Sequence, residues 1–444
     1  MSSNIKQLNL LESYQGSENN FFYRKRSWSA AKHRIILRYI QAYCYTLGGS
    51  KVYQSNRINY IDGFAGTGVY DEGIGIEDFT NQSKFWKRYQ INFDDKDGSP
   101  IIALKLARAF KEENRVNLSC FFSEAKKSNH EKLTKNCLSI GDGLDYKIYE
   151  CQTFRKVFPT LMEDLGSYPA IFFIDTFGVK GFEFEQIKDI GKYLSENKGE
   201  LFLLFHNRQI ARHAGHLTTT SNDPKSLKAS ETYMKNLTNF LGPSSEHDWQ
   251  EKWMQLKDKP QSFEKWALAY FCQRIVSETQ VNGIASYEIK EKYDDVRPQY
   301  SIVVCSNHPR KAFGDYLNDF FADENRLLFF RENSILNLTD FLDSEWNKQT
   351  VRQKMEVKSK IKGFINGNIF QWRELKDVVT SVILEFGKQE YGLGYLKRSE
   401  YKELIDELFQ EGEIEGKELG RNNNIKYNSL IRMTQEYNLP KANF

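Results

Sequence analysis

The sequence lacks cysteine pairs of the kind that bind zinc or form disulfide frameworks. Its six cysteines are scattered over 444 residues without a Cys-x-x-Cys spacing, which argues against zinc knuckles and disulfide-stapled folds. No uncharged apolar run is long enough to span a membrane, and residues 1–20 lack the basic and apolar regions of a signal peptide. These absences predict a soluble, cytoplasmic protein.

The chain also lacks a strong excess of charge of either sign. Lys and Arg total 62 and Asp and Glu total 59, so the net charge is +3. This balance gives no global electrostatic argument for binding nucleic acid or a membrane, and any basic binding surface must be local. Residues 23–34 and 358–363 are two basic stretches that either follow a phosphate backbone or are ordinary solvated faces.

The alternation of apolar runs and helix-like stretches predicts an α/β fold. After an expected helix over residues 27–47, five parallel strands are predicted at 58–62, 118–123, 146–150, 170–174 and 200–205. Two more strands, beginning at Gly283 and Tyr300, are joined by a short polar segment and are therefore expected to pair antiparallel at one edge. The prediction is a doubly wound, mainly parallel, seven-stranded Rossmann-like sheet.

At this length the chain is expected to form more than one domain. We place a helical lead-in at residues 1–50, the α/β domain at 51–344 with insertions at 70–97 and 231–280, and a C-terminal domain at 345–444. The Lys-rich run after about residue 345 is interpreted as a connector. Beyond it, two amphipathic helices, a glycine and a short polar strand pair give the outline of a winged helix-turn-helix.

The first candidate site is the segment INYIDGFAGTGVY at 58–70. A strand ends at Asp62 and continues into a loop with Gly63, Gly66 and Gly68, which would let backbone N–H groups approach a ligand. Such a loop is also a common strand-to-helix turn, so both interpretations stay open. The next helix is expected to begin with Ser99 as its N-cap.

Two further positions fit a nucleotide site. Glu124 follows the second strand, where a doubly wound fold places the carboxylate that binds a ribose diol. Gln152 follows the third strand, a place suited to cofactor contacts. In the segment AIFFIDTFGVKGF, Asp175 ends the fourth strand and Phe177 follows it. They suit the orientation and stacking of a planar amine, or else they are a helix N-cap and a core residue.

The loop after the fifth strand is rich in His and Arg. Its spacing fits no known zinc pattern, so no metal site is expected. It is either a phosphate- or substrate-contacting loop or a solvated basic loop. The candidate substrate-binding residues are His206, Arg208, Arg212 and His213.

Several of these motifs together carry a resemblance to a known family. They are YIDGFAGTG at 60–68, GSP at 98–100, SEA at 123–125, FFIDTFG at 172–178, and the LKDVV and LIDELFQEGEIEG stretches of the tail. With them, the sequence resembles the three-Cys-motif partner proteins (TcmP), which are similar to class I S-adenosylmethionine-dependent methyltransferases. The resemblance covers nearly the whole chain. It implies a seven-stranded methyltransferase sheet, a C-terminal winged helix, S-adenosyl-L-methionine as cofactor and a partner protein bearing the three cysteines.

The resemblance also implies roles for the motif residues. The methionine side of the cofactor would be lined by Asp62, Gly63, Phe64, Gly66 and Gly68, the ribose would be bound by Glu124, and Ser99 and Gln152 would complete the cofactor site. Asp175 and Phe177 would face the methyl acceptor. Thr176 stands where the family pattern has proline, so base methylation is an analogy.

Three functions therefore remain open. The first is methyl transfer to nucleic acid. The second is an adaptor that uses the methyltransferase fold as a scaffold and the winged helix for nucleic-acid or protein binding. The third is another nucleotide-using enzyme such as a dehydrogenase, although the loop lacks Gly-x-Gly-x-x-Gly spacing.

Overall fold

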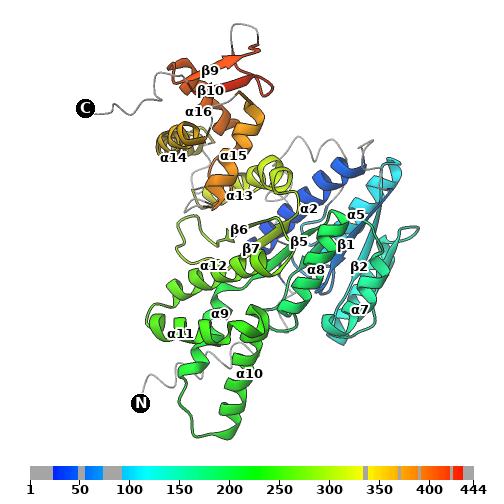
Figure 1. Cartoon of the computed structure of the whole chain (residues 1–444). Coiled ribbons are helices and arrows are strands. Elements are labelled where there is room, and N and C mark those ends of the chain that lie inside the picture. Colours follow the sequence, from blue (N-terminus) through cyan, green and yellow to red (C-terminus); the bar gives the residue numbers. More distant parts are fainter. Residues whose placement is uncertain are drawn as a thin grey trace. The chain divides into compact units, whose positions relative to one another are not determined.

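The computed structural model describes residues 24–48, 56–73, 93–333, 339–368, 372–388, 392–420 and 424–433 (Figure 1). The chain divides into two compact units. Unit 1 comprises Met1–Ile284, Glu288–Glu291 and Arg297–Asn307, and unit 2 comprises Ala285–Tyr287, Lys292–Val296 and His308–Phe444.

A seven-stranded sheet in the order β3-β2-β1-β4-β5-β7-β6 forms the centre of the α/β fold. Its strands are β1 (Arg57–Asp62), β2 (Asn117–Phe122), β3 (Tyr146–Ile148), β4 (Ala170–Ile174), β5 (Glu200–Phe205), β6 (Gly283–Ile289) and β7 (Tyr300–Ser306). Strands β1 to β5 pair in parallel, and β7 runs antiparallel to β5. The predicted mostly parallel sheet of seven strands is therefore confirmed.

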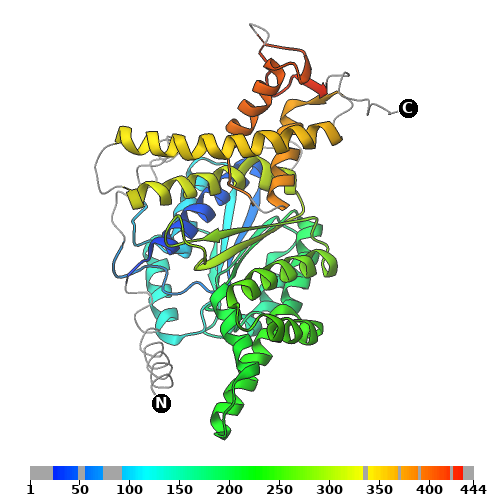
Figure 2. The same cartoon turned by 90° about the vertical axis from the view of Figure 1, so that its left-hand side faces the viewer.

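Helices cover both faces of this sheet, which explains why the strands are apolar at almost every position. Every residue of β4 and β5 is buried, as expected for strands with helices on both sides. Figure 2 shows the N-terminal helix in blue on one side of the sheet and green helices on the other. Helix α2 (Ser27–Gly48) precedes β1, and the helices that connect the parallel strands are α5 (Ser99–Glu112), α6 (Lys127–Ile140), α7 (Phe154–Leu165) and α8 (Phe184–Asn197).

The region between β5 and β6 is helical, as predicted. It contains α9 (Asn207–Gly215), α10 (Pro224–Leu241), α11 (Glu246–Leu256) and α12 (Pro260–Glu278), with 3-10 turns at His216–Thr218 and Pro243–Ser245. These helices extend the core, because Phe205 of β5 packs against Phe240 and Phe271, with ring centroids 5.9 and 5.4 Å away. The expected insertion at 231–280 therefore begins inside α10.

Unit 2 consists of helices and a small sheet. Its elements are the π-helical turn η3 (Arg310–Leu317), α13 (Asn318–Asn333), α14 (Thr339–Asn368), β8 (Arg373–Glu374), α15 (Leu375–Lys388), α16 (Arg398–Gln410), β9 (Ile414–Lys417) and β10 (Leu430–Met433). Strand β10 pairs antiparallel with both β8 and β9. Two helices followed by a strand pair appear in the predicted order, and the winged-helix assignment itself stays a prediction.

The expected domain boundary at about residue 345 lies inside helix α14. The Lys-rich run is not a connector, because Val357, Ile361 and Ile365 form a buried face of this helix. The lysines on its other side form ion pairs with acids of α16 and the turn after it. These pairs are Lys354–Glu403 at 2.8 Å, Lys358–Glu407 at 2.8 Å, Lys358–Glu411 at 2.7 Å and Lys362–Glu413 at 2.6 Å. The basic stretch at 358–363 is therefore partly neutralised within the fold.

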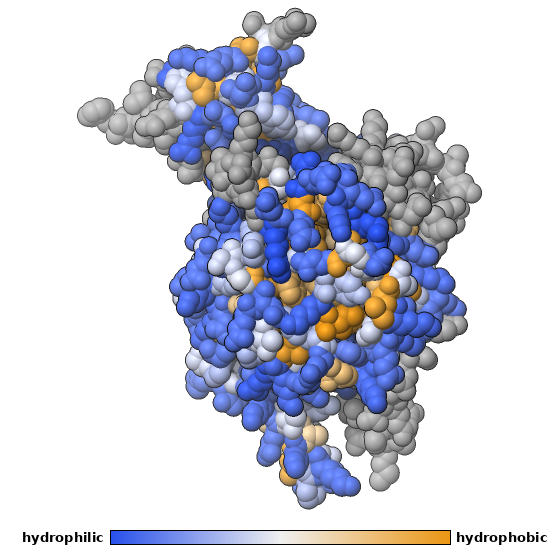
Figure 3. Space-filling model, turned by 90° about the vertical axis from the view of Figure 1, so that its right-hand side faces the viewer, coloured by the Kyte–Doolittle hydropathy of each residue, from blue (hydrophilic) through white to orange (hydrophobic). Residues whose placement is uncertain are grey.

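Among the described residues, no helix is both long and apolar enough to cross a membrane. Figure 3 shows one face of the molecule, on which hydrophilic residues cover most of the area and apolar residues gather in smaller areas.

Candidate functional site

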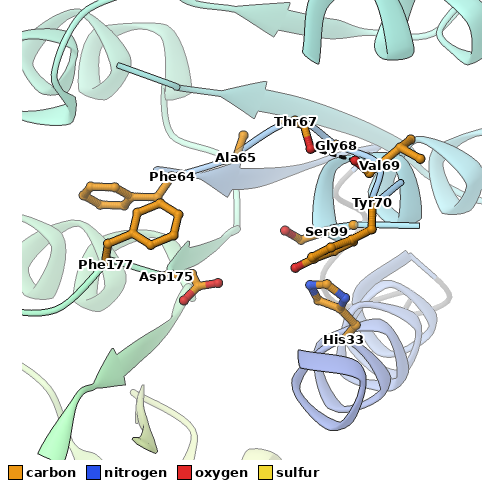
Figure 4. A pocket seen from close by; sticks show the side chains of 11 residues that line it. His33, Phe64, Ala65, Thr67, Gly68, Val69, Tyr70, Ser99, Asp175 and Phe177 are labelled. Atoms are coloured by element: carbon orange, nitrogen blue, oxygen red, sulfur yellow. Dashed lines mark hydrogen bonds between the residues drawn. The ribbon is translucent and has the colours of Figure 1, made fainter. Parts of the chain in front are cut away.

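A cavity lies at the carboxyl ends of β1 and β4, where parallel α/β sheets bind their ligands. Five of the residues predicted from sequence line it: Phe64, Gly68, Ser99, Asp175 and Phe177. They come from the loop after β1, the start of α5 and the turn after β4 (Figure 4). The structure therefore brings together three motifs that are far apart in the chain.

The loop after β1 depends on its glycines. Gly66 and Gly68 have φ angles of 63° and 77°, a left-handed conformation that favours glycine. The Gly98 N–H donates to the Gly68 carbonyl at 2.8 Å, and a Cβ on Gly98 would lie 2.7 Å from that oxygen. This close approach fixes the start of α5 beside the loop.

Ser99 is the first residue of α5 and not its N-cap, which corrects the sequence prediction. Gly98 occupies the cap position without a side-chain hydrogen bond. The reason is the contact just described, because a capping side chain at position 98 would collide with Gly68. Ser99 instead lines the cavity.

Glu124 holds the glycine loop in place through hydrogen bonds to backbone N–H groups. Its two carboxylate oxygens accept the N–H groups of Gly66 at 3.0 Å and Lys126 at 2.7 Å. Burial raises the pKa of Glu124, and these N–H groups oppose that rise. Glu124 is buried and is not among the residues that line the cavity.

Asp62 is fully buried at the end of β1. One carboxylate oxygen accepts the Phe64 N–H at 3.3 Å, while Oδ2 has no hydrogen-bond partner among the described residues. Burial raises the pKa of Asp62 to about 7, as does nearby Asp175, whereas Ser99, the Phe64 N–H and Lys32 lower it. Near neutral pH, Asp62 is therefore a mixture of the acid and the carboxylate.

Asp175 forms an ion pair with Lys32 of α2. The Lys32 ammonium donates to Asp175 Oδ2, and the two side chains are 4% and 22% exposed. Burial alone would lower the pKa of Lys32, but Asp175 raises it, both through its charge and through the hydrogen bond. Lys32 therefore stays protonated, and Asp175 lines the cavity (Figure 4).

The turn after β4 excludes the alternative reading of Asp175 as a helix N-cap and Phe177 as core. The N-cap of α8 is Glu183, and Phe177 is 53% exposed. Thr176, in the place of proline, is buried and its hydroxyl donates to the Gly178 carbonyl. His206 contacts the Thr176 carbonyl through Nε2 and thus supports this turn.

Six cavity residues were not predicted as site residues: His33, Ala65, Thr67, Val69, Tyr70 and Gly98. His33 lies on α2 and Tyr70 follows the glycine loop, and their ring centroids are 6.1 Å apart. Lys32, behind Asp175, was also missed as a site residue. The sequence feature that could have indicated them is the position of Lys32 and His33 within the apolar pattern of the helix. The sequence analysis instead assigned these two side chains to a basic surface.

The basic stretch 23–34 does not form a continuous exposed surface. Lys25, Lys32 and Arg34 are buried. Burial lowers the pKa of Lys25 to about 7, against the opposing charge of Asp97. The three buried cations are therefore not on the surface, where they would have to lie to contact a phosphate backbone.

The predicted substrate loop after β5 lies outside the cavity lining. Burial lowers the pKa of His213 to about 4, and its Nδ1 contacts the Tyr233 carbonyl of α10 at 3.1 Å. Arg208 and Arg212 are exposed on α9. His213 thus packs under α10 because the helical region after β5 covers it, which sequence spacing did not reveal.

Gln152 and the insertion 70–97 were also expected to contribute to the site. Gln152 is exposed, donates to Glu150 at 2.9 Å and does not line the cavity. Of the insertion 70–97, residues 74–92 lie outside the described residues, while its two ends meet where the Tyr70 N–H donates to Lys96 at 2.9 Å. Within the described residues, no group of three or more His, Cys, Asp or Glu is arranged to hold a metal ion.

Comparisons with known proteins assign no family. A scan against protein-family models finds no match, and no curated protein matches the sequence. Among solved structures, the chain is similar to the crystal structure of a Legionella pneumophila protein described by the family-model DUF519, with 11% sequence identity and a TM-score of 0.36. The match covers 66% of this chain and 89% of that chain. A similarity at this level carries no argument about function.

Proposed function

We propose that the protein is an S-adenosylmethionine-dependent methyltransferase that acts on nucleic acid, as its resemblance to the three-Cys-motif partner proteins implies. The observation that carries the proposal is the convergence of the glycine loop, the start of α5 and the turn after β4 on one cavity. These are the positions at which a doubly wound fold holds a nucleotide cofactor.

The residues present fit such a cofactor. Gly66 and Gly68 leave the loop backbone without side chains at left-handed positions, and Phe64, Gly68 and Ser99 would contact the cofactor directly. The unpartnered oxygen of Asp62 lies beneath this loop. When bound, S-adenosylmethionine supplies a methyl group activated by a positively charged sulfur.

The acceptor side is formed by Asp175 and Phe177. Because Lys32 occupies Oδ2 of Asp175, the other oxygen is directed at an N–H donor such as an exocyclic amine. Phe177 is more than half exposed, and an exposed ring offers a stacking face for a planar base. The two side chains would thus orient an amine acceptor, and correct positioning of the acceptor is the main requirement of a direct displacement.

Calorimetric titration of the purified chain tests the cofactor part of this proposal. We expect binding of S-adenosylmethionine on the order of micromolar Kd, and no binding of NADH or ATP. Glu124→Ala should weaken binding roughly 10-fold or more, because the carboxylate accepts the Gly66 N–H and so orders the glycine loop. Glu163→Ala, on the exposed face of α7, is the matched control. Unchanged affinity in Glu124→Ala would refute the site assignment.

A second function, an adaptor, is favoured by the ion pair itself. Asp175 is already bound by a buried lysine, and Thr176 replaces the proline of the family pattern. In this case unit 2 would bind the partner. A candidate contact surface is Trp372, whose ring lies 4.2 Å from the Lys417 ammonium and 4.6 Å from the Arg432 guanidinium.

The two functions separate in a binding assay with the full chain and a labelled oligonucleotide. An adaptor predicts that Lys417→Glu weakens binding several-fold, because one phosphate contact reverses sign, while Phe177→Ala, at an exposed ring, leaves binding unchanged. A methyltransferase that holds its acceptor in the cavity predicts that Phe177→Ala weakens binding and that Lys417→Glu leaves it unchanged. Binding that responds to neither substitution argues against both contact surfaces.

A further inference from the structure

His33 is a buried histidine without a hydrogen-bond partner for one of its ring nitrogens. The residue is 2% exposed, and its Nδ1 atom has no partner among the described residues. Buried polar atoms are nearly always hydrogen-bonded, and leaving one unpaired costs about 1–3 kcal/mol. Because His33 lines the cavity (Figure 4), a ligand can supply the missing partner.

The surroundings of His33 favour an anionic partner. Burial, together with the charges of Lys25, Lys32 and Arg34, lowers the pKa of His33 well below its usual value. The ring is therefore neutral near pH 7 and keeps one N–H, while the positive charges of Lys32 and Arg34 raise the local electrostatic potential. A neutral N–H donor in a positive potential is suited to an oxygen that carries negative charge.

The helix opposite His33 adds to this preference. The cavity is also lined by Gly98 and Ser99, at the N-terminus of the 14-residue helix α5. The Gly98 N–H is bonded to Gly68 and Pro100 has no N–H, so the anion-binding contribution of this end is the positive potential of the helix dipole together with the Ser99 side chain and backbone. His33 and the start of α5 thus approach the same space from two elements.

We propose that His33 Nδ1–H and the N-terminus of α5 form a subsite for an anionic oxygen of the ligand. This inference rests on the proposed function when the oxygen belongs to the carboxylate of S-adenosylmethionine. The same chemistry is offered by the phosphate of a nucleotide, so the ligand source is decided by experiment. His33 is then a binding residue, and Lys25, Lys32 and Arg34 act on it through their charges.

Pairs of ligands that differ only in the anionic group provide the test. The full chain is titrated with S-adenosylmethionine and with its decarboxylated form, and separately with AMP and adenosine. In one of the two pairs, the wild-type chain should bind the anionic member roughly 10-fold more tightly or better, the effect of one hydrogen bond to a charged group. This comparison needs no variant and does not depend on how a substitution folds.

The variant His33→Phe should abolish that preference and leave the affinity for the uncharged member unchanged. It should not lower the Tm of the free protein, because Nδ1 has no partner to lose among the residues that the structure describes and an apolar ring of similar shape replaces it. His216→Phe is the control, since His216 stacks on Tyr233 outside the cavity lining and should keep the preference. His33→Asn, which restores a donor, should recover part of it.

The outcomes separate this inference from the proposed function. A preference for S-adenosylmethionine over its decarboxylated form that is lost in His33→Phe supports both. A preference for AMP over adenosine that is lost in His33→Phe, without binding of S-adenosylmethionine, supports the subsite and overturns the methyltransferase proposal. Tight S-adenosylmethionine binding without any carboxylate or phosphate preference, or a preference that survives in His33→Phe, overturns the subsite alone.

Discussion

Replacing Lys32 by methionine should destabilise the α/β unit by about 3–5 kcal/mol, because the substitution leaves the Asp175 carboxylate without its buried counter-ion. The Lys32 and Asp175 side chains are only 4% and 22% exposed, so water cannot replace the lost partner fully. Asp175→Asn should be similarly costly, since it leaves the ammonium of Lys32 buried and unpaired. Chemical denaturation of the two variants measures both effects.

The double variant Lys32→Met/Asp175→Asn isolates the pair. It removes both charges, and replacing a buried ion pair by neutral groups is often close to neutral in stability. We therefore expect it to be more stable than either single variant, a coupling on the order of several kcal/mol. Lys147→Met is the surface control, because Lys147 and Asp164 are 47% and 30% exposed and such pairs contribute about 1 kcal/mol or less. A Lys32→Met cost no larger than that of Lys147→Met contradicts the argument.

The sheet could be predicted because its strands carry a strong local signal. β4 and β5 are short, apolar at almost every position and buried throughout, and few other structures produce that pattern between helix-like segments. The short link before Tyr300 predicted that β6 and β7 are partners, and they are neighbours at one edge of the sheet. In both cases the signal lies in residues that are close in the sequence.

The burial of two basic side chains of α2 could not be predicted from the local sequence pattern. Lys32 and His33 lie in a stretch that contains enough charge to suggest an exposed face. Their burial depends on Asp175 and on the glycine loop, which are distant in sequence and become neighbours only through the parallel pairing of β1 with β4. Conversely, the same pairing made it possible to expect Asp175 near the loop after β1.

The Lys-rich part of α14 illustrates the same limit in unit 2. A helix whose lysines face Glu407 and Glu411 of another segment has no strong apolar run of its own, and it was interpreted as a connector. The acids that compensate it lie about 50 positions further on, since the paired residues are 49 and 53 apart. Charge complementarity between two distant helices is not visible in the periodicity of either one.

Asp62 should lower the stability of the folded protein as the pH rises from about 4 to about 7. Burial raises the folded-state pKa of this carboxyl to about 7 from an ordinary value of 3.8. Between these two values the unfolded chain loses the proton while the folded chain keeps it, so that deprotonation favours unfolding. The difference corresponds to about 4 kcal/mol, at 1.36 kcal/mol per pKa unit, and it is fully lost above about pH 7.

Comparison of the wild-type chain with Asp62→Asn isolates this contribution from other titrating groups. Denaturant unfolding is followed from pH 4 to pH 8 for both proteins, and the difference in their unfolding free energies is plotted. Because asparagine does not titrate, the variant should gain stability relative to the wild type as the pH rises, with the change complete near neutrality. Asp164→Asn is the control. Burial would raise the pKa of Asp164, but hydrogen bonds from Lys147 and Tyr149 lower it. The Asp164→Asn variant should therefore lose stability relative to the wild type as the pH rises, and at lower pH than the change expected for Asp62→Asn. A difference for Asp62→Asn that stays constant over this range would mean that the carboxyl ionises normally and that its unpartnered oxygen is solvated in the folded protein.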